Sequence, residues 1–234
     1  MENEMNKTKS LMAFSTAIGF SVVSLPVLAY EAGDWLIRGR IIQVAPQDSS
    51  GNIYVNGGSG FNSIGQGVAV NSDVVPEIDI TYMLHRNWGV ELILGYSEHT
   101  VRGNEGNGAL GDVANTRVLP PTVTLQYHFR PDADIRPYVG AGINYTYFFD
   151  ESVPTSSALS APGDSVKLDS SWGLALQAGV DVAIDEDWFF NIDVKYLDID
   201  TQAHYSGILD GNTRARVNAD IDPLVWGIGI GRRF

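Results

Sequence analysis

The chain ends in a strict two-residue alternation, in which single glycines separate Trp226, Ile228 and Ile230 ahead of the terminal residue Phe234. Successive side chains of a β-strand point to opposite faces, so this pattern places the large apolar residues on one face and the glycines on the other. A strand with lipid on one side and a crowded lumen on the other needs this distribution. The ending is therefore typical of the last strand of an outer-membrane β-barrel.

The first residues have the features of an export signal. Lys7 and Lys9 precede an apolar run from Leu11 to Leu25, and Ala29 is the small residue that signal peptidase needs before its cleavage point. Serine and threonine interrupt this run, which is shorter than the roughly 20 apolar residues of a spanning helix and so disfavours a single membrane anchor. We expect residues 1–29 to be a cleaved signal peptide and residues 30–234 to form one outer-membrane barrel.

The composition limits the possible partners and cofactors. The chain has no cysteine, which excludes disulfides and thiolate metal sites. Its formal net charge of −13 argues against nucleic acid as a partner. We expect a monomer in contact with outer-membrane lipid and lipopolysaccharide, with no cofactor and no metal.

The alternation predicts eight strands, and the lengths of their connections set the orientation. The strands are expected at residues 34–45, 73–84, 88–101, 118–130, 136–149, 170–184, 188–204 and 215–234. The connections at 85–87, 131–135 and 185–187 are short, whereas those at 46–72, 102–117, 150–169 and 205–214 are long and polar. Short turns face the periplasm and long loops face outside. The predicted fold is all-β, an eight-stranded antiparallel up-and-down transmembrane barrel.

The aromatic residues support this orientation independently. Trp35, Trp88 and Trp188 each open an odd-numbered strand and so fall at the periplasmic level. A second set falls at the opposite strand ends: Tyr96, Tyr145, Tyr147, Phe149 and Trp172. Two aromatic girdles are expected where rings lie at the depth of the lipid headgroups.

Strand parity places charged residues of both signs on the lumen face. They are Arg38, Arg40, Glu77, Asp79, Glu91, Asp193 and Lys195, and the same face carries Gln126, His128, Gln177, Asp181 and Asn191. The interior of an eight-stranded barrel is only about wide enough for its own side chains. Because unpaired charges there are costly, we expect an ion-paired floor in the periplasmic half. The alternative is a gate or polar constriction.

The lumen face becomes apolar nearer the outer side. The residues expected there are Ile42, Val44, Phe148, Leu197, Ile199, Val217 and Ile221. An apolar cavity closed below by charges suits a small hydrophobic ligand, because binding pockets are concave and mostly apolar. The alternative is the packed core of a small barrel.

Four prolines lie within predicted strands, towards their outer ends. They are Pro76, Pro120, Pro121 and Pro223. Proline cannot donate a hydrogen bond to the ladder. The missing bonds favour either a lateral opening from the lumen into the outer leaflet, or bulges at the limit of the membrane-embedded sheet.

Several long strings in this sequence resemble the OmpW family. They are VPEIDITY at residues 75–82, LPPTVTLQYHF at 119–129, RPYVGAGINYT at 136–146 and DVKY at 193–196, and the sequence GDW at 33–35 also fits. The strings recur in order over the whole mature chain. Arg232 departs from the pattern, since the family usually has an aromatic residue at that point.

The resemblance implies a narrow hydrophobic channel for the passive uptake of small apolar molecules, released sideways into the outer membrane as in the related alkane-import protein AlkL. It does not identify the substrate. The main alternative is a sealed structural or receptor barrel whose extracellular loops bind phage, colicin or host partners. An enzyme is disfavoured, because His204 and Asp200 share a face near the outer rim, where polar residues are ordinary.

Overall fold

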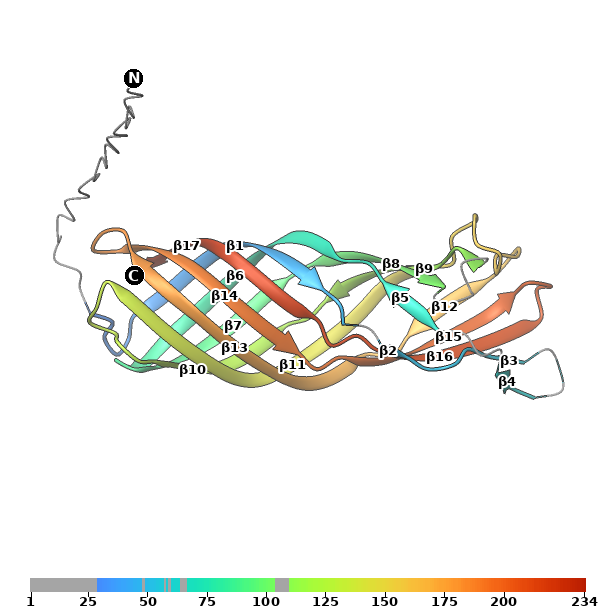
Figure 1. The fold of residues 1–234 in the computed structure, drawn as a ribbon, viewed down its shortest axis with the longest axis horizontal. Helices are drawn as coiled ribbons and strands as arrows, with labels where there is room; N and C mark the ends of the chain where they lie inside the picture. The colour runs from blue at the N-terminus through green and yellow to red at the C-terminus, as the bar shows by residue number, and fades with distance from the viewer. Residues whose placement is uncertain (1–28, 48, 57, 59, 64–66, 104–109) are drawn as a thin grey trace, which may run out of the picture.

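The computed structural model describes residues 29–47, 49–56, 58, 60–63, 67–103 and 110–234. The signal peptide expected at residues 1–29 lies outside this part, except for its last residue. Within the described ranges, no helix is long and apolar enough to cross a membrane. The chain is built almost entirely from β-strands (Figure 1).

Among the described residues, eight antiparallel strands form a closed barrel. They are β1 (Trp35–Ala45), β6 (Asp73–His85), β7 (Trp88–Gly95), β10 (Thr122–His128), β11 (Ile135–Ser152), β13 (Ser171–Ala183), β14 (Trp188–Leu197) and β17 (Leu224–Arg233). Each strand pairs with the next in this series, and β1 pairs with β17 to close the ring. The predicted eight-stranded antiparallel barrel is confirmed.

Further strands continue the barrel beyond its outer end, on the right in Figure 1. They are β8 (Ser97–Gly103), β9 (Asp112–Leu119), β12 (Ser165–Leu168), β15 (Asp200–Ile208) and β16 (Thr213–Asp220). The connections predicted at 102–117 and 150–169 are therefore shorter than expected, because β9 and β12 begin inside them. Their inward positions Val113 and Val166 are buried against other apolar side chains, which stabilises strand pairing outside the membrane.

The connection at 46–72 also contains short strands rather than an unbroken loop. They are β2 (Ser49–Ser50), β3 (Tyr54–Asn56), β4 (Asn62–Ser63) and β5 (Val68–Val70). β3 pairs with β16 and β5 pairs with β8, so this connection lies along the extended sheets. Val68 is buried in the apolar core that these extensions enclose.

The barrel strands alternate between exposed and buried residues, as a lipid-facing barrel requires. In β1, Trp35, Ile37 and Ile41 are exposed, whereas Leu36 and Arg38 are buried. Each of the remaining seven barrel strands also carries large apolar residues on its outward surface, for example Ile78, Leu92, Leu125, Ile143, Leu174, Ile192 and Ile228. The parity assignment of the lipid face is thus correct.

Aromatic side chains pair at both ends of the membrane-embedded barrel. At one end, the ring centroids of Trp35 and Tyr82 lie 4.9 Å apart. At the other end, the rings of Tyr145 and Trp172 lie 4.7 Å apart. These pairs occupy the two levels at which the sequence predicts aromatic girdles.

The prolines lie differently from the prediction. Of the four named prolines, only Pro76 is inside a strand, where it is exposed and faces Ile41 of β1. Pro120 and Pro121 lie between β9 and β10, and Pro223 lies just before β17. Because proline lacks the backbone donor, the strands end on either side of these residues instead of running through them.

The ladder between β7–β8 and β9–β10 is interrupted at the two adjacent prolines. Pairing stops at Ile93 with Thr122 and resumes at Ser97 with Val118. Residues 94–96 on one side and 119–121 on the other lie between these pairs. We call this stretch the ladder interruption. Ladder pairing is missing from this stretch of the seam.

Candidate functional site: the lumen

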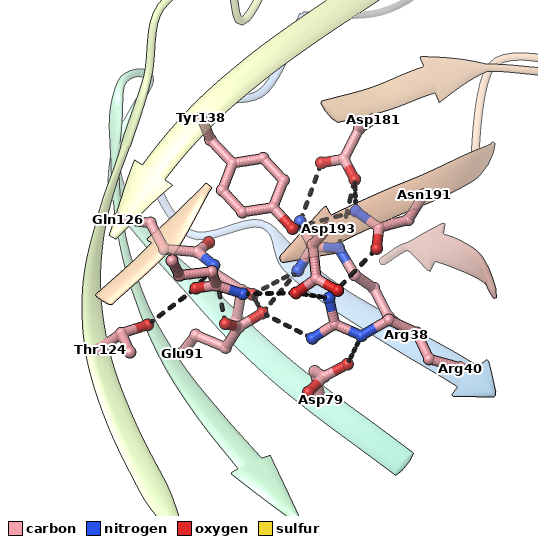
Figure 2. A network of polar contacts seen from close by, with 12 residues as sticks. Arg38, Arg40, Asp79, Glu91, Thr124, Gln126, Tyr138, Asp181, Asn191 and Asp193 are labelled. Atoms are coloured by element: carbon pink, nitrogen blue, oxygen red, sulfur yellow. Dashed lines mark hydrogen bonds and ion pairs between the residues drawn. The ribbon is translucent and has the colours of Figure 1, made fainter. Parts of the chain in front are cut away.

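Charged side chains from four strands, β1, β6, β7 and β14, meet in the inner half of the barrel. We call the seven predicted residues Arg38, Arg40, Glu77, Asp79, Glu91, Asp193 and Lys195 the charged floor. Each is at most 5% exposed. Figure 2 shows Arg38 and Arg40 among the acidic groups that surround them.

Arg40 is the centre of the charged floor. Its Nε lies 3.1 Å from Glu77 Oε1 and 2.5 Å from Asp79 Oδ2. Its Nη1 contacts the Asp193 carboxylate. Lys195 connects two of these acids, because its Nζ lies 2.5 Å from Glu77 Oε1 and 3.3 Å from Asp193 Oδ2.

Arg38 holds the periplasmic side of the same network. Its Nη1 lies 3.1 Å from Glu91 Oε1, and its Nη2 lies 2.8 Å from Asp181 Oδ2. The Nε atom also donates to Asp181 Oδ1 at 3.3 Å, which makes the contact bidentate. All seven predicted residues therefore lie in one connected network.

The charged floor has more negative than positive groups. With Asp181 included, three cationic side chains face five carboxylates, a formal charge of −2. Amide side chains complete the network: Gln126 donates to Glu91 at 2.7 Å and Gln177 donates to Asp193 at 3.1 Å. Pairing offsets the cost of burying these charges only while every partner stays in place.

Tyr30 closes the periplasmic end of the lumen, and strand reasoning misses it because it precedes β1. The side chain is fully buried with Leu36, Met83 and Phe189. The guanidinium of Arg136 lies 4.2 Å from the centre of the Tyr30 ring, within cation–π distance. Its only sequence signal is an aromatic residue at the expected start of the mature chain.

An apolar cavity of about 80 Å³ lies above the charged floor. All seven residues predicted for the apolar lumen line it: Ile42, Val44, Phe148, Leu197, Ile199, Val217 and Ile221. Glu77 and Lys195 line it too, so the cavity ends on the charged floor. Gly95, Tyr96 and Pro120 line its side, so it also reaches the ladder interruption.

Of the four prolines predicted at a lateral opening, Pro120 and Pro223 line the cavity. Pro120 and Pro121 lie together in the ladder interruption, whereas Pro223 is buried just before β17. Pro76 faces outward on β6. The structure therefore does not bring the four prolines to one place.

Beyond the membrane-spanning strands, the lumen continues into a second apolar core. A smaller cavity of about 20 Å³ lies there, between Val55, Val113, Leu159 and Tyr205. Leu209 N donates to Leu159 O at 2.8 Å, which ties the loop after β11 to the turn that joins β15 and β16. The two cavities share Val68, Tyr205 and Val217 in their walls, so they are neighbours along the lumen.

The residues considered for catalysis do not form a catalytic set. His204 Nε2 lies 3.1 Å from Asp169 Oδ2, and both side chains are exposed. Asp200 instead lies with Asp198 and Asp222, the carboxylate oxygens of the three being within 4.8 Å of one another. His99 is turned inward and contacts Ser97 Oγ at 2.9 Å.

Comparison with known proteins places the chain in a family. The model of the OmpW family matches residues 31–234. Outer membrane protein W of Vibrio cholerae serotype O1 is 36% identical over 221 residues, covering 93% of this chain and 96% of that protein. The dibenzothiophene metabolism operon protein PahQ of Pseudomonas aeruginosa is 30% identical and covers 87% of this chain and 90% of its own length.

The fold is also that of a solved outer-membrane protein. The crystal structure of OprG from Pseudomonas aeruginosa matches with a TM-score of 0.80 and 39% sequence identity. The match covers 89% of this chain and 99% of that one.

Proposed function

Because the chain belongs to the OmpW family of outer-membrane proteins, we propose that it is a channel for the passive uptake of small hydrophobic molecules. These molecules occupy the apolar cavity and leave sideways into the outer membrane at the ladder interruption. The observation that carries the proposal is that Gly95 and Pro120 belong to both the cavity wall and the interruption.

The charged floor favours a sideways exit over an exit to the periplasm. A molecule that passed the floor would separate buried ion pairs such as Arg38 and Asp181, which is strongly unfavourable. A move from the cavity into lipid only exchanges one apolar environment for another. The proposed route therefore bypasses the charges.

The name of one relative supports a hydrophobic substrate class. PahQ is named for a dibenzothiophene metabolism operon, and dibenzothiophene is an apolar polycyclic compound. An apolar cavity with a polar end suits molecules of this general character.

A second candidate function is a receptor barrel that transports nothing. The observation that favours it is the packed core outside the membrane, in which Ile208 and Val166 are almost completely buried. Such a core supports the extracellular turns as a rigid surface. In that case the loops, and not the lumen, recognise the partner.

Uptake of a radiolabelled medium-chain alkane separates the two candidates. Cells that lack the gene are compared with cells in which it is restored, with lipopolysaccharide intact. We expect faster uptake on restoration, and a loss of this gain with Leu197→Asp, which places a carboxylate in the cavity wall. The matched control is Leu209→Asp, because Leu209 is 49% exposed and lies outside the cavity.

Heat-modifiable migration in a denaturing gel establishes that each variant is folded. If the folded wild-type barrel does not change alkane uptake at any chain length, the channel proposal is wrong. The receptor function is then the candidate to pursue.

A further inference from the structure

The inner end of the apolar cavity has two polar atoms whose hydrogen-bonding capacity is not used. Both belong to the ion pair of Lys195 and Glu77, which lines the cavity floor. The wall above them includes Ile42, Leu197 and Val225. Polar capacity at one end of an apolar cavity is a feature that selects ligands.

Lys195 has one unused donor. Its ammonium group carries three N–H bonds. Two of them are directed to Glu77 Oε1 at 2.5 Å and to Asp193 Oδ2 at 3.3 Å. In the described part of the chain the third N–H has no acceptor. Since the side chain is 3% exposed and lines the cavity, an acceptor for this N–H has to come from a molecule in the cavity.

Glu77 has one unused acceptor beside that donor. Its Oε1 takes the contacts from Arg40 at 3.1 Å and from Lys195. Its Oε2 accepts no hydrogen bond from any residue that the structure describes. Oε2 lies 3.8 Å from the position that a Cβ atom on Gly95 would occupy, so it is close to the ladder interruption.

We infer that the inner end of the cavity binds the hydroxyl group of an aliphatic alcohol, with the alkyl chain in the apolar part above. This inference rests on the proposed channel function and specifies its substrate class. A hydroxyl group accepts from the Lys195 ammonium and donates to Glu77 Oε2, so it uses both atoms at once. An alkane leaves both unused, and an ester or a ketone uses only the donor.

The same floor disfavours a fatty carboxylate. A ligand carboxylate at the inner end lies against the Glu77 carboxyl group, in a network whose acidic groups outnumber its cations and include Asp79 and Asp193. Like charges that are buried together repel strongly, because water does not screen them. The ligand class is therefore uncharged at its polar end.

The experiment compares three labelled probes of equal chain length, decane, 1-decanol and decanoate, at pH 7.5. Uptake is measured in cells with the mature protein in the outer membrane, and the rate of cells without it is subtracted. We expect 1-decanol to exceed decane by at least about threefold, in line with one or two buried hydrogen bonds. We expect decanoate to be slower than decane.

Two variants test the assigned atoms. The double change Glu77→Leu with Lys195→Met removes both polar groups without leaving a lone charge, a replacement that buried ion pairs often tolerate. It should abolish the preference for 1-decanol over decane, measured as the ratio of the two uptake rates in the same cells. Glu77→Gln should increase decanoate uptake several-fold. The control is Glu186→Gln, which removes the same charge from an exposed residue in a periplasmic turn and should leave decanoate uptake unchanged.

The outcomes separate this inference from the proposed function. If no probe depends on the protein, the channel function itself is wrong. If decane uptake depends on the protein but 1-decanol shows no advantage, or the double variant keeps that advantage, the hydroxyl subsite is wrong and the channel remains. Equal uptake of decane and decanoate overturns the charge selection.

Discussion

The hydroxyl group of Tyr30 donates to Asp181 Oδ2 at 3.1 Å, which joins the segment before β1 to the interior of β13. Asp181 is also the bidentate partner of Arg38. Tyr30 precedes the barrel strands, yet through Asp181 it is connected to Arg38 of the charged floor. The periplasmic end of the lumen is closed by this contact and by the buried ring.

Substitution of Tyr30 should separate the roles of its hydroxyl group and its ring. Tyr30→Phe removes one hydrogen bond and should lower the free energy of unfolding by about 1 kcal/mol. Tyr30→Ala also removes a fully buried ring and should cost about 3–5 kcal/mol. Guanidinium unfolding of the barrel refolded in lipid vesicles measures both.

Tyr82→Phe is the control, because Tyr82 is 38% exposed in the lipid-facing girdle and should tolerate the change within about 0.5 kcal/mol. A Tyr30→Ala barrel as stable as the wild type would show that the ring does not close the lumen in the membrane.

Arg40 should be the most sensitive residue of the charged floor. Arg40→Met leaves Asp79 and Asp193 buried without their main cation and should cost about 3–5 kcal/mol. Arg117→Met is the comparison, since Arg117 pairs with Glu98 at 3.0 Å but is 44% exposed, and it should cost far less stability than Arg40→Met. The same unfolding assay compares them.

If Arg40→Met does not fold, Arg40→Lys gives the test. It keeps the charge but loses the planar fork that serves several carboxylates, so an intermediate loss of stability is expected. Equal stability of Arg40→Lys and the wild type would contradict the central role of the guanidinium.

Strand alternation was sufficient to predict the barrel and both parts of its lumen. A closed sheet leaves only two directions for a side chain, so the parity of Ile42 or Leu197 also gives its position relative to the lumen. The same argument places Arg40 and Lys195 on one face. Their mutual distances follow from the strand register, which the hydrophobic pattern largely determines.

Parity does not determine where strands end or what lies outside them. Pro120 and Pro121 are compatible with a bulge or with a break, and the pairing of the neighbouring strand decides between these. β9 begins at Asp112, in a stretch whose sequence predicts a loop. The strand is stabilised by packing against an apolar core whose other residues are distant in the sequence. Tyr30 has no strand parity at all.

Acidic residues just outside the membrane-spanning strands should make stability depend on pH. Partial burial and the carboxylates of Asp220, Asp198 and Asp222 raise the pKa of Asp200 above its ordinary value of 3.8. The folded state therefore binds a proton at Asp200 more tightly than the unfolded state does. The contribution of this proton to the free energy of unfolding is complete below pH 3.8 and is lost as the pH rises through the raised pKa.

Asp200→Asn should therefore stabilise the barrel at pH 7, by no more than about 0.5 kcal/mol because the group is exposed. The gain should disappear near pH 3.8. Unfolding midpoints measured at several pH values check this. Asp185→Asn is the control, because backbone N–H groups lower the pKa of Asp185. This change should therefore destabilise the barrel at pH 7. A gain that is the same at all pH values would exclude carboxylate repulsion as its cause.

Gly95 is the residue at which the exit route can be closed with the smallest disturbance. A Cβ atom there meets nothing closer than Glu77 Oε2 at 3.8 Å, which is an ordinary contact distance. The longer side chain of Gly95→Leu then occupies the cavity wall at the ladder interruption, and alkane uptake should fall towards the rate of cells without the protein. Gly39→Leu is the matched control, because Gly39 is exposed on the lipid face and a Cβ atom there meets nothing within 4 Å. If both variants are folded and take up alkane at the same rate, the substrate does not leave at the ladder interruption.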